Sequence, residues 1–286
     1  MKKKILIFGG SGLLGSFLSS HLKNNYKIVT TSNQNKNSHY RVDLTDVKKT
    51  FNLLKKISPN IVINCVAYTD VDKCNINLNT AFEKNVVSIF NIVNSLKKMK
   101  KKAHLIHIST DQVYNQKSPL KKSNEDQINF ANNYGLTKYM GEKQIVNYKT
   151  STILRTNFFG NSLKNIRDSY SDLLTKNLKN KKSFKIPTNV YFNPIHMKIL
   201  SSLIEKIIKK KIFGTYNIGS KNGISQYKFV VLVAKKLKLK FNKIIKFKSN
   251  ISIHRKPNGT IMDIKKIEKK LKIKIPKINK SINLLY

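Results

Sequence analysis

Short apolar runs, typical of strands, alternate along the first half of the chain with segments whose apolar residues recur at helical spacing. Lys4–Phe8 is a short apolar run, and Gly12–Leu22 then carries leucine and phenylalanine at helical spacing. The alternation continues, with strands predicted at 27–31, 61–67, 103–109 and 151–155 and helices at 46–57, 80–98 and 134–147. Thr45 is the predicted N-cap of the second helix. Strand–helix alternation places parallel strands side by side with crossover helices, so we predict an α/β fold with a Rossmann-type doubly wound parallel sheet.

The pattern loosens after Phe159-Gly160. Helices are predicted at 172–178, 196–210 and 226–237, the last capped by Ser225, and a strand at 214–218, whereas the last 40 residues hold only short apolar pieces. We therefore predict a dinucleotide-binding domain over residues 1–155. Residues 156–286 are expected to form mainly a smaller C-terminal substrate lobe, with 214–219 returning to the main sheet.

The net charge of +42 is high, but it says little about the function of the chain. Four of the 56 basic residues are arginine and 52 are lysine, scattered through nearly every segment. Nucleic-acid recognition favours arginine for bidentate contacts, and no nucleic-acid-binding motif is present, so we expect no nucleic-acid partner. A solvated lysine surface is the favoured interpretation, and binding of another polyanion is the alternative that the charge leaves open.

Four features of the sequence bear on the core and on the compartment. Hydrophobic residues make up 40% of the chain, which allows a packed core, and no apolar run reaches 18 residues, so no membrane span is expected. The first apolar run is too short for the core of a signal peptide. Two cysteines, Cys65 and Cys74, are too few for a disulfide framework. These features predict a reduced, cytoplasmic protein.

Gly9, Gly12 and Gly15 follow the first predicted strand at a spacing of three. Glycines at this spacing permit a tight turn and a close approach of phosphate, and the N–H groups at the helix start, at Leu13 and Leu14, supply donors. The alternative is a glycine-rich turn that binds no ligand. We predict dinucleotide binding, because an apolar strand precedes the turn and an amphipathic helix follows it.

The residues after the second strand bear on the choice of cofactor. An acidic side chain there binds the adenosine ribose and repels a 2′-phosphate, but this chain has Thr31 and Ser32 and no carboxylate before Asp43. Hydroxyl groups on a basic surface favour NADPH, with NADH as the alternative cofactor.

Tyr134 and Lys138 lie one helical turn apart, so both side chains share one face. A ketone reductase needs a proton donor, and a tyrosine whose pKa is lowered by a neighbouring lysine suits that role. Thr110, at the end of the fourth strand, is placed to donate a hydrogen bond to the same oxygen. Chance tyrosine–lysine pairs are expected in so lysine-rich a chain, but this pair opens the helix that follows the Thr110 strand.

Further motifs extend this pattern nearly from end to end. They are Gly9–Gly15, Asp43–Asp46, Asn64–Lys73, Ser109–Tyr114, Tyr134–Lys138 with Gly141-Glu142, Leu154–Thr156, Gly214–Asn217, and Arg255–Asn258 followed by Asp263. Together they resemble the extended short-chain dehydrogenase/reductase superfamily and, within it, the dTDP-4-dehydrorhamnose reductase family.

The resemblance implies an NADPH-dependent reductase of a nucleotide-linked 4-keto-6-deoxy sugar, an oxidoreductase in dTDP-rhamnose and surface polysaccharide biosynthesis. It implies that Thr110, Tyr134 and Lys138 are catalytic, that Asp43 and Leu44 flank the adenine, that Ala67 and Tyr68 line the path to the nicotinamide, and that Thr110, Asn157 and Arg255 contact the substrate. The alternative is a non-catalytic NADP-binding subunit similar to the regulatory subunit of methionine adenosyltransferase. A homodimer stays open.

The chain departs from the family pattern around the sugar. It has Phe158 and no tryptophan after Arg155-Thr156, and Tyr191–Ile195 replaces a glycine-proline-threonine turn. Members of the family have been described with magnesium held by acidic residues, but with 14 acidic residues here we predict no metal. These departures weaken the prediction of which sugar is bound more than the prediction of hydride transfer.

Overall fold

The computed structural model describes residues 1–33, 38–118, 120–163, 168–180, 183–240, 244–249 and 257–285. The chain divides into two compact units. The sheet unit comprises Met1–Thr110, Asn132–Arg155 and Ser201–Tyr216, and the second unit comprises Asp111–Ala131, Thr156–Leu200 and Asn217–Tyr286.

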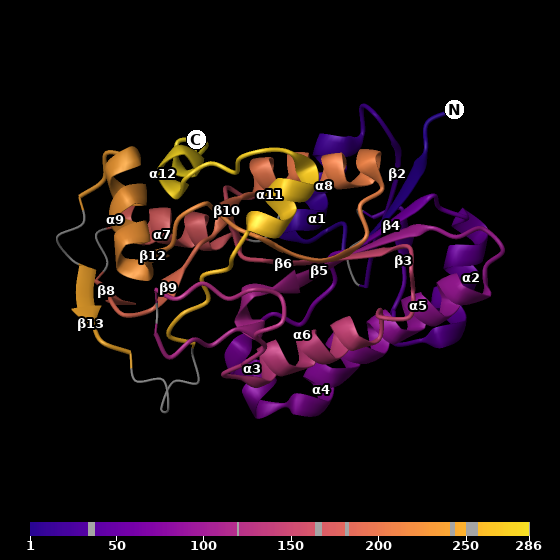
Figure 1. Cartoon of the computed structure of the whole chain (residues 1–286), viewed down its shortest axis with the longest axis horizontal. Helices are drawn as coiled ribbons and strands as arrows, with labels where there is room; N and C mark the ends of the chain where they lie inside the picture. Colours follow the sequence, from indigo (N-terminus) through magenta and orange to yellow (C-terminus); the bar gives the residue numbers. More distant parts are fainter. Residues whose placement is uncertain are drawn as a thin grey trace. The chain divides into compact units, whose positions relative to one another are not determined.

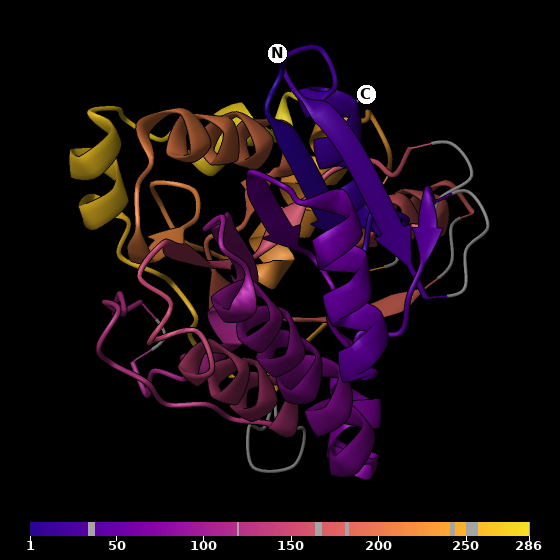
Figure 2. The ribbon, with the colours of Figure 1, turned by 90° about the vertical axis from the view of Figure 1, so that its right-hand side faces the viewer.

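A seven-stranded sheet forms the centre of the sheet unit (Figure 1). Its strands, in spatial order, are β11 (Gly214–Ile218), β6 (Ser151–Thr156), β5 (His104–Thr110), β4 (Ile61–Asn64), β1 (Lys4–Phe8), β2 (Lys27–Ser32) and β3 (Tyr40–Arg41). β1 pairs in parallel with both β2 and β4, and Figure 2 shows β1 and β2 side by side with β3 beyond them. The predicted doubly wound α/β fold is confirmed, and β1 and β4 pair in parallel.

Helices cover both faces of this sheet. α2 (Val47–Ile57), α5 (Ser88–Lys98) and α6 (Asn133–Lys143) lie along one face, and α1 (Leu13–Leu22) lies on the other (Figure 1). α3 (Val71–Ile76) was not predicted. The helix predicted at 80–98 consists of α4 (Leu78–Phe82), a π-helical turn η1 (Glu83–Val87) and α5.

The predicted N-cap of α2 was wrong by one residue. Asp46 caps the helix, because its carboxylate accepts a hydrogen bond from the Lys49 N–H at 2.9 Å. Thr45 instead donates its hydroxyl to Asp43 at 2.8 Å. Two adjacent residues with capping side chains were present, and only the path of the chain decides which of them caps.

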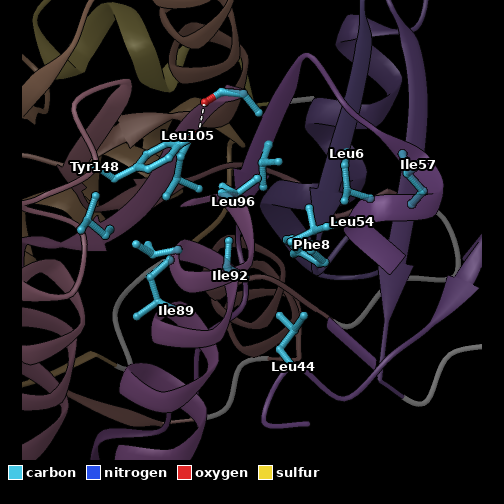
Figure 3. Packing of buried hydrophobic residues seen from close by; sticks show 14 of the residues in the cluster. Leu6, Phe8, Leu44, Leu54, Ile57, Ile89, Ile92, Leu96, Leu105 and Tyr148 are labelled. Carbon is cyan, nitrogen blue, oxygen red and sulfur yellow. Dashed lines mark hydrogen bonds between the residues drawn. The ribbon is translucent and has the colours of Figure 1, made fainter. Parts of the chain in front are cut away.

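The core of the sheet unit lies between the strands and α2 and α5 (Figure 3). Its labelled members are Leu6 and Phe8 of β1, Leu105 of β5, Leu54 and Ile57 of α2, and Ile89, Ile92 and Leu96 of α5, with Leu44 and Tyr148. Each fully buried aliphatic side chain stabilises the fold by about 1.5–3 kcal/mol relative to leaving it exposed. The Tyr148 hydroxyl donates to the Ala103 carbonyl at 2.7 Å, which satisfies the one polar atom that this ring carries into the core.

The second unit consists of short strands and helices. Its elements are η2 (Asp111–Val113), β7 (Phe158–Phe159), α7 (Tyr170–Lys179), β8 (Phe184–Pro187), β9 (Tyr191–Phe192), β10 (Ile195–His196), β12 (Ile224–Ser225), α9 (Gln226–Lys236), β13 (Ile244–Phe247), α11 (Lys265–Leu271) and α12 (Ile278–Ile282), and α8 (Met197–Lys210) begins in it. The rings of Phe159 and Phe192 pack edge-on against Phe229 at 5.1 and 5.6 Å. The predicted cap of α9 is confirmed, because Ser225 accepts from the Lys228 N–H.

The two compact units differ from a single division at residue 155 in two segments. Residues 111–131 belong to the second unit, and residues 201–216 belong to the sheet unit. Strand β11 lies beside β6 at the edge of the main sheet. The assignment of dinucleotide and substrate roles to separate parts of the chain stays a prediction. Within the described ranges, no helix is long and apolar enough to span a membrane.

Candidate functional site

The glycine turn lies at the switch point of the sheet. β1 ends at Phe8, directly beside Asn64 at the end of β4, and the strand order runs outward from this pair in both directions. Doubly wound sheets bind ligands at the carboxyl ends of the strands at such a point. Gly9 has φ +78°, in the left-handed region that favours glycine, and turns the chain from β1 toward α1.

The turn fits a dinucleotide pyrophosphate. A Cβ on Gly15 would lie 2.2 Å from the Gly9 carbonyl oxygen, so only glycine lets α1 begin this close to the strand. α1 starts at Leu13 after Gly12, no side chain caps its N-terminus, and its first turn carries no acidic residue. Helix-start N–H groups without a capping side chain are suited to bind an anion.

The other predicted cofactor residues lie along the same edge of the sheet unit. Thr31 and Ser32 end β2 and are buried, and residues 34–37 that follow lie outside the described part of the chain. Asp43 accepts from Thr45 and pairs with Lys84 at 3.3 Å. The backbone N–H of Thr45 is the main cause that lowers the pKa of the Asp43 carboxyl, and Lys84 contributes. Leu44 is buried.

Helix α6 carries the predicted catalytic pair. Asn132 caps it by accepting from the Gly135 N–H at 2.8 Å. Tyr134 and Lys138 are both buried, and the Lys138 Nζ donates to the Ile108 carbonyl at 2.8 Å. Ile108 lies two residues before Thr110 on β5, so the structure brings Lys138 to the end of the strand that carries Thr110.

The π-helical turn η1 connects α6 with the predicted cofactor segment. Asn85 accepts from the Tyr68 N–H at 2.8 Å and donates to the Thr137 hydroxyl at 3.0 Å. Tyr68 and Tyr134 belong to one apolar cluster with Cys74 and Ala81. Sequence analysis missed Asn85, because an asparagine inside a helical pattern gives no signal of its own.

A buried ion pair fixes α6 to the strands. Glu142 accepts from Arg155 Nε at 3.0 Å and from the second guanidinium nitrogen at 2.6 Å, and it also accepts from the Ser109 hydroxyl. Both charged side chains are about 5% exposed or less. The network joins α6 to β6 and to the residue before Thr110. Glu142 and Arg155 were quoted among the family motifs, but without a role.

Burial controls the electrostatics around Lys138. It lowers the pKa of Lys138 to about 8, against the opposing influence of Glu142 and Cys65. Burial likewise raises the pKa of the Cys65 thiol to about 12. It also lowers the pKa of His107 well below its ordinary value, with the charge of Lys138 as a second cause, so this imidazole is neutral at pH 7.

Asn157 lies in the second unit, where it is part of a polar network. Its amide donates to Asp111 at 3.0 Å, and the same carboxylate oxygen accepts from the Thr260 hydroxyl at 2.7 Å. Arg255 lies outside the described residues. In the Tyr191–Ile195 turn, the buried Asn193 bonds the backbone of Ser220 and Met262 at 3.0 Å each. Among the described residues, no group of three histidine, cysteine or acidic side chains is arranged to hold a metal ion.

The parallel sheet, the glycine turn at its switch point and the Tyr134–Lys138 pair define a protein of the short-chain dehydrogenase/reductase class. The chain belongs to the RmlD substrate binding domain family, whose sequence profile matches residues 2–286. The family resemblance inferred from the motifs is thereby confirmed.

Three similar proteins extend this comparison. The spore coat polysaccharide biosynthesis protein SpsK of Bacillus subtilis is 26% identical over 80% of this chain and 78% of its own. A dTDP-4-dehydrorhamnose reductase of Aggregatibacter actinomycetemcomitans is 24% identical over the same shares, 80% and 78%. The crystal structure of dTDP-4-dehydrorhamnose reductase from Bacillus anthracis in complex with NADP superposes with a TM-score of 0.87 at 21% identity, over 99% of this chain and 98% of that one.

Proposed function

We propose that this protein is an NADPH-dependent reductase of a nucleotide-linked 4-keto-6-deoxy sugar in surface polysaccharide synthesis. The observation that carries the proposal is the buried Tyr134–Lys138 pair on α6, bonded to β5 just before Thr110. The names of the similar proteins, dTDP-4-dehydrorhamnose reductase and a polysaccharide biosynthesis protein, support a reductase over a non-catalytic regulatory subunit.

The sheet unit offers the binding site for the cofactor. The glycine turn and the start of α1 at Leu13 and Leu14 would hold the pyrophosphate, and Thr31 with Ser32 would lie toward the adenosine 2′-phosphate. The similar structure from Bacillus anthracis was determined in complex with NADP, which supports NADPH as the cofactor here. When bound, NADPH supplies the hydride for the reduction.

The chain's own residues supply the proton and the stabilisation of charge. Tyr134 holds the proton that reaches the new hydroxyl, and the ammonium form of Lys138 lowers the pKa of that phenol. Thr110 donates a hydrogen bond to the oxygen on which charge develops. Burial of Tyr134 and Lys138 excludes water from the proton and strengthens each of these interactions.

For the substrate, we propose that Asn157 contacts the sugar and that Arg255 binds the diphosphate. The bond from Asn157 to Asp111 supports a fixed orientation of this amide. A guanidinium holds phosphate oxygens in a bidentate way that lysine does not reproduce, so Arg255→Lys should raise KM for the nucleotide sugar and leave NADPH affinity unchanged. An unchanged KM with every active sugar would remove Arg255 from the substrate site.

The test is NADPH oxidation by the purified chain with a panel of nucleotide-linked 4-keto-6-deoxy sugars, with Tyr134→Phe as the inactive control. We expect turnover with at least one sugar, and the panel identifies which one. Calorimetric titration at low salt should give tighter binding of NADPH than of NADH, with the difference shrinking as salt rises. Absence of turnover with the whole panel, despite NADPH binding, would favour the regulatory subunit.

A homodimer and a cytoplasmic location complete the proposal. Phe82 on α4 and Phe90 on α5 are 37% and 48% exposed, which supports an apolar contact between two copies. Sedimentation at several concentrations should detect a dimer that Phe90→Lys weakens and Leu284→Lys, at another exposed apolar position, does not. A monomer at all concentrations would end this proposal. The free thiols of Cys65 and Cys74 support a reducing compartment.

A further inference from the structure

Lys138 is buried among few groups that can balance its charge. On its own helix α6 it has Tyr134 and Glu142, from β5 it faces His107 and the Ile108 carbonyl, and after β4 it has the thiol of Cys65. Glu142 accepts bonds from Arg155 and Ser109, which engage both of its oxygens. The polar contacts of Nζ itself are the Ile108 carbonyl at 2.8 Å and His107 Nε2 at 3.4 Å.

The tautomer of His107 follows from its other neighbour. Asn64 and His107 are register partners on β4 and β5, and Asn64 Nδ2 lies 3.1 Å from His107 Nδ1. The amide of Asn64 is oriented by the Val66 N–H, which donates to Oδ1 at 3.1 Å. Nδ2 is therefore the group that faces the ring. Because Nδ2 only donates, Nδ1 of His107 accepts, and the ring proton of the neutral imidazole is on Nε2.

This places an N–H against the amine of Lys138. Nε2–H donates to Nζ only when Nζ carries a lone pair, which is the neutral amine. The ammonium form would set N–H against N–H, with no acceptor between them. A change of tautomer would relieve this contact, but it would put Nδ1–H against Asn64 Nδ2, and turning the Asn64 amide would leave the part-buried Val66 N–H facing a donor.

We propose that Asn64 holds His107 in the Nε2–H tautomer, and that this imidazole stabilises the neutral amine of Lys138. Asn64 and His107 are then positioning residues that set the pH at which Lys138 changes charge, in addition to the effect of burial. The inference deepens the proposed function and rests on it for the role of Lys138 in turnover. The contacts that fix the tautomer do not depend on that role.

A second histidine on the same strand provides a matched control. His104 is also buried on β5, but its Nε2 lies 2.7 Å from the Thr152 hydroxyl, which itself donates to the Ile212 carbonyl. It faces no cation. A substitution of His104 therefore removes a buried imidazole from β5 without touching Lys138.

The tautomer is tested directly by nitrogen NMR of the full chain labelled at histidine. The chain has six histidines, and His107→Gln assigns the resonance in question. We expect a neutral Nε2–H ring at pH 7, with an Nε2 shift that titrates together with Lys138 and no longer does so in Lys138→Met. A proton on Nδ1, or an imidazolium at pH 7, would overturn the proposal. This measurement needs no substrate, so it stands whether or not the reductase function is confirmed.

Turnover provides the second test, through the alkaline limb of the pH–rate profile, where Lys138 loses its charge. Asn64→Asp exchanges the donor that faces His107 Nδ1 for an acceptor, with little change of shape. The ring proton should then move to Nδ1, so that Nε2 presents an acceptor to Lys138 Nζ. We expect the limb to move up by about one to two pH units, the size of a hydrogen bond to a charged group. His107→Gln keeps an acceptor toward Asn64 and a donor toward Nζ, so its limb should stay near that of the parent. His104→Gln should not move it.

The carboxylate introduced by Asn64→Asp can also shift the alkaline limb directly, through its negative charge. The double variant Asn64→Asp with His107→Leu measures this direct effect, because it lacks the imidazole. Loss of most of the shift in this double variant supports the imidazole as the intermediary. A shift of the same size without the imidazole would overturn the proposal, as would an unmoved limb in Asn64→Asp. If no variant and no parent protein turns over any sugar, the proposed function has failed, and the NMR result alone decides the inference.

Discussion

Replacing Glu142 with glutamine should destabilise the protein more than any change at a surface ion pair. The carboxylate is about 3% exposed and holds the equally buried guanidinium of Arg155 by three contacts of 2.6–3.1 Å. Glutamine keeps the shape but removes the charge, and its amide presents a donor to a group that can only donate. The buried guanidinium then loses the carboxylate that it contacts at 2.6–3.1 Å.

Breaking a buried pair from one side costs about 3–5 kcal/mol, because the desolvated charge that remains has no compensation. Removing both charges costs less, since nothing charged is left in the apolar site. Glu142→Gln and Arg155→Met should therefore each lose about 3–5 kcal/mol of the free energy of unfolding, and the double variant should lose no more than either single one. The contact from Glu142 to Ser109 adds to the cost of the first change.

Urea unfolding followed by far-ultraviolet circular dichroism measures these differences, with Lys209→Gln as the control. Lys209 pairs with Glu205 at 2.8 Å, but its side chain is 57% exposed, so the control curve should stay close to that of the parent. Single variants that lose less than about 1 kcal/mol would mean that water reaches the pair. Additive losses in the double variant would show that the two side chains do not depend on each other.

Three further outcomes are expected. Tyr134→Phe should keep NADPH affinity and lose about 10²–10⁴-fold in kcat, whereas Lys138→Ala should damage both quantities; parent-level turnover in the phenylalanine variant would remove Tyr134 as the acid. Gly15→Ala should abolish dinucleotide binding by calorimetry, because its Cβ would lie 2.2 Å from the Gly9 carbonyl oxygen, and unchanged binding would place the cofactor elsewhere. The folded-state pKa of Lys138, about 8, lies below the ordinary 10.5, so the unfolded chain binds the proton more readily between these values. Stability relative to Lys138→Met should therefore rise with pH between about 8 and 10.5, and a flat difference would mean that the amine is solvated.

The parallel sheet could be predicted because its inner strands are buried along their whole length. β1 and β4 read as continuous apolar runs, which is typical of strands covered on both faces. The two-residue strands of the second unit, such as β9 and β10, could not be predicted in this way, because two residues are too few to show a pattern of apolar positions. Their positions depend on contacts between distant segments, such as the bond from the Tyr191 N–H to the Asn258 carbonyl.

The candidate site likewise has one part that could be predicted from local spacing and another that depends on contacts between distant segments. That Tyr134 and Lys138 lie on one face of α6 could be predicted, because helical spacing alone puts them there. The contact of Lys138 with His107, and of His107 with Asn64, could not be predicted, since Asn64 and His107 meet only through the register of β4 and β5, and nothing in a sequence states a register. Asn85 escaped notice for a similar reason, because its two partners, Tyr68 and Thr137, come from different segments.

The scarce acidic residues explain why the high charge says so little about function. Of the described carboxylates, Asp46 and Asp70 cap helices, Asp172 completes a capping box on α7, and Glu142 is buried against Arg155. Each is engaged in local structure, and 14 acidic residues in all cannot balance the 56 basic residues of the chain. The resulting positive field attracts any anion, the phosphates of a dinucleotide and of a nucleotide sugar included, and salt weakens it for all of them alike. Specificity must therefore come from groups that the fold fixes, and in the candidate site the glycine turn, Tyr134 and Lys138 are held by contacts that do not depend on the net charge.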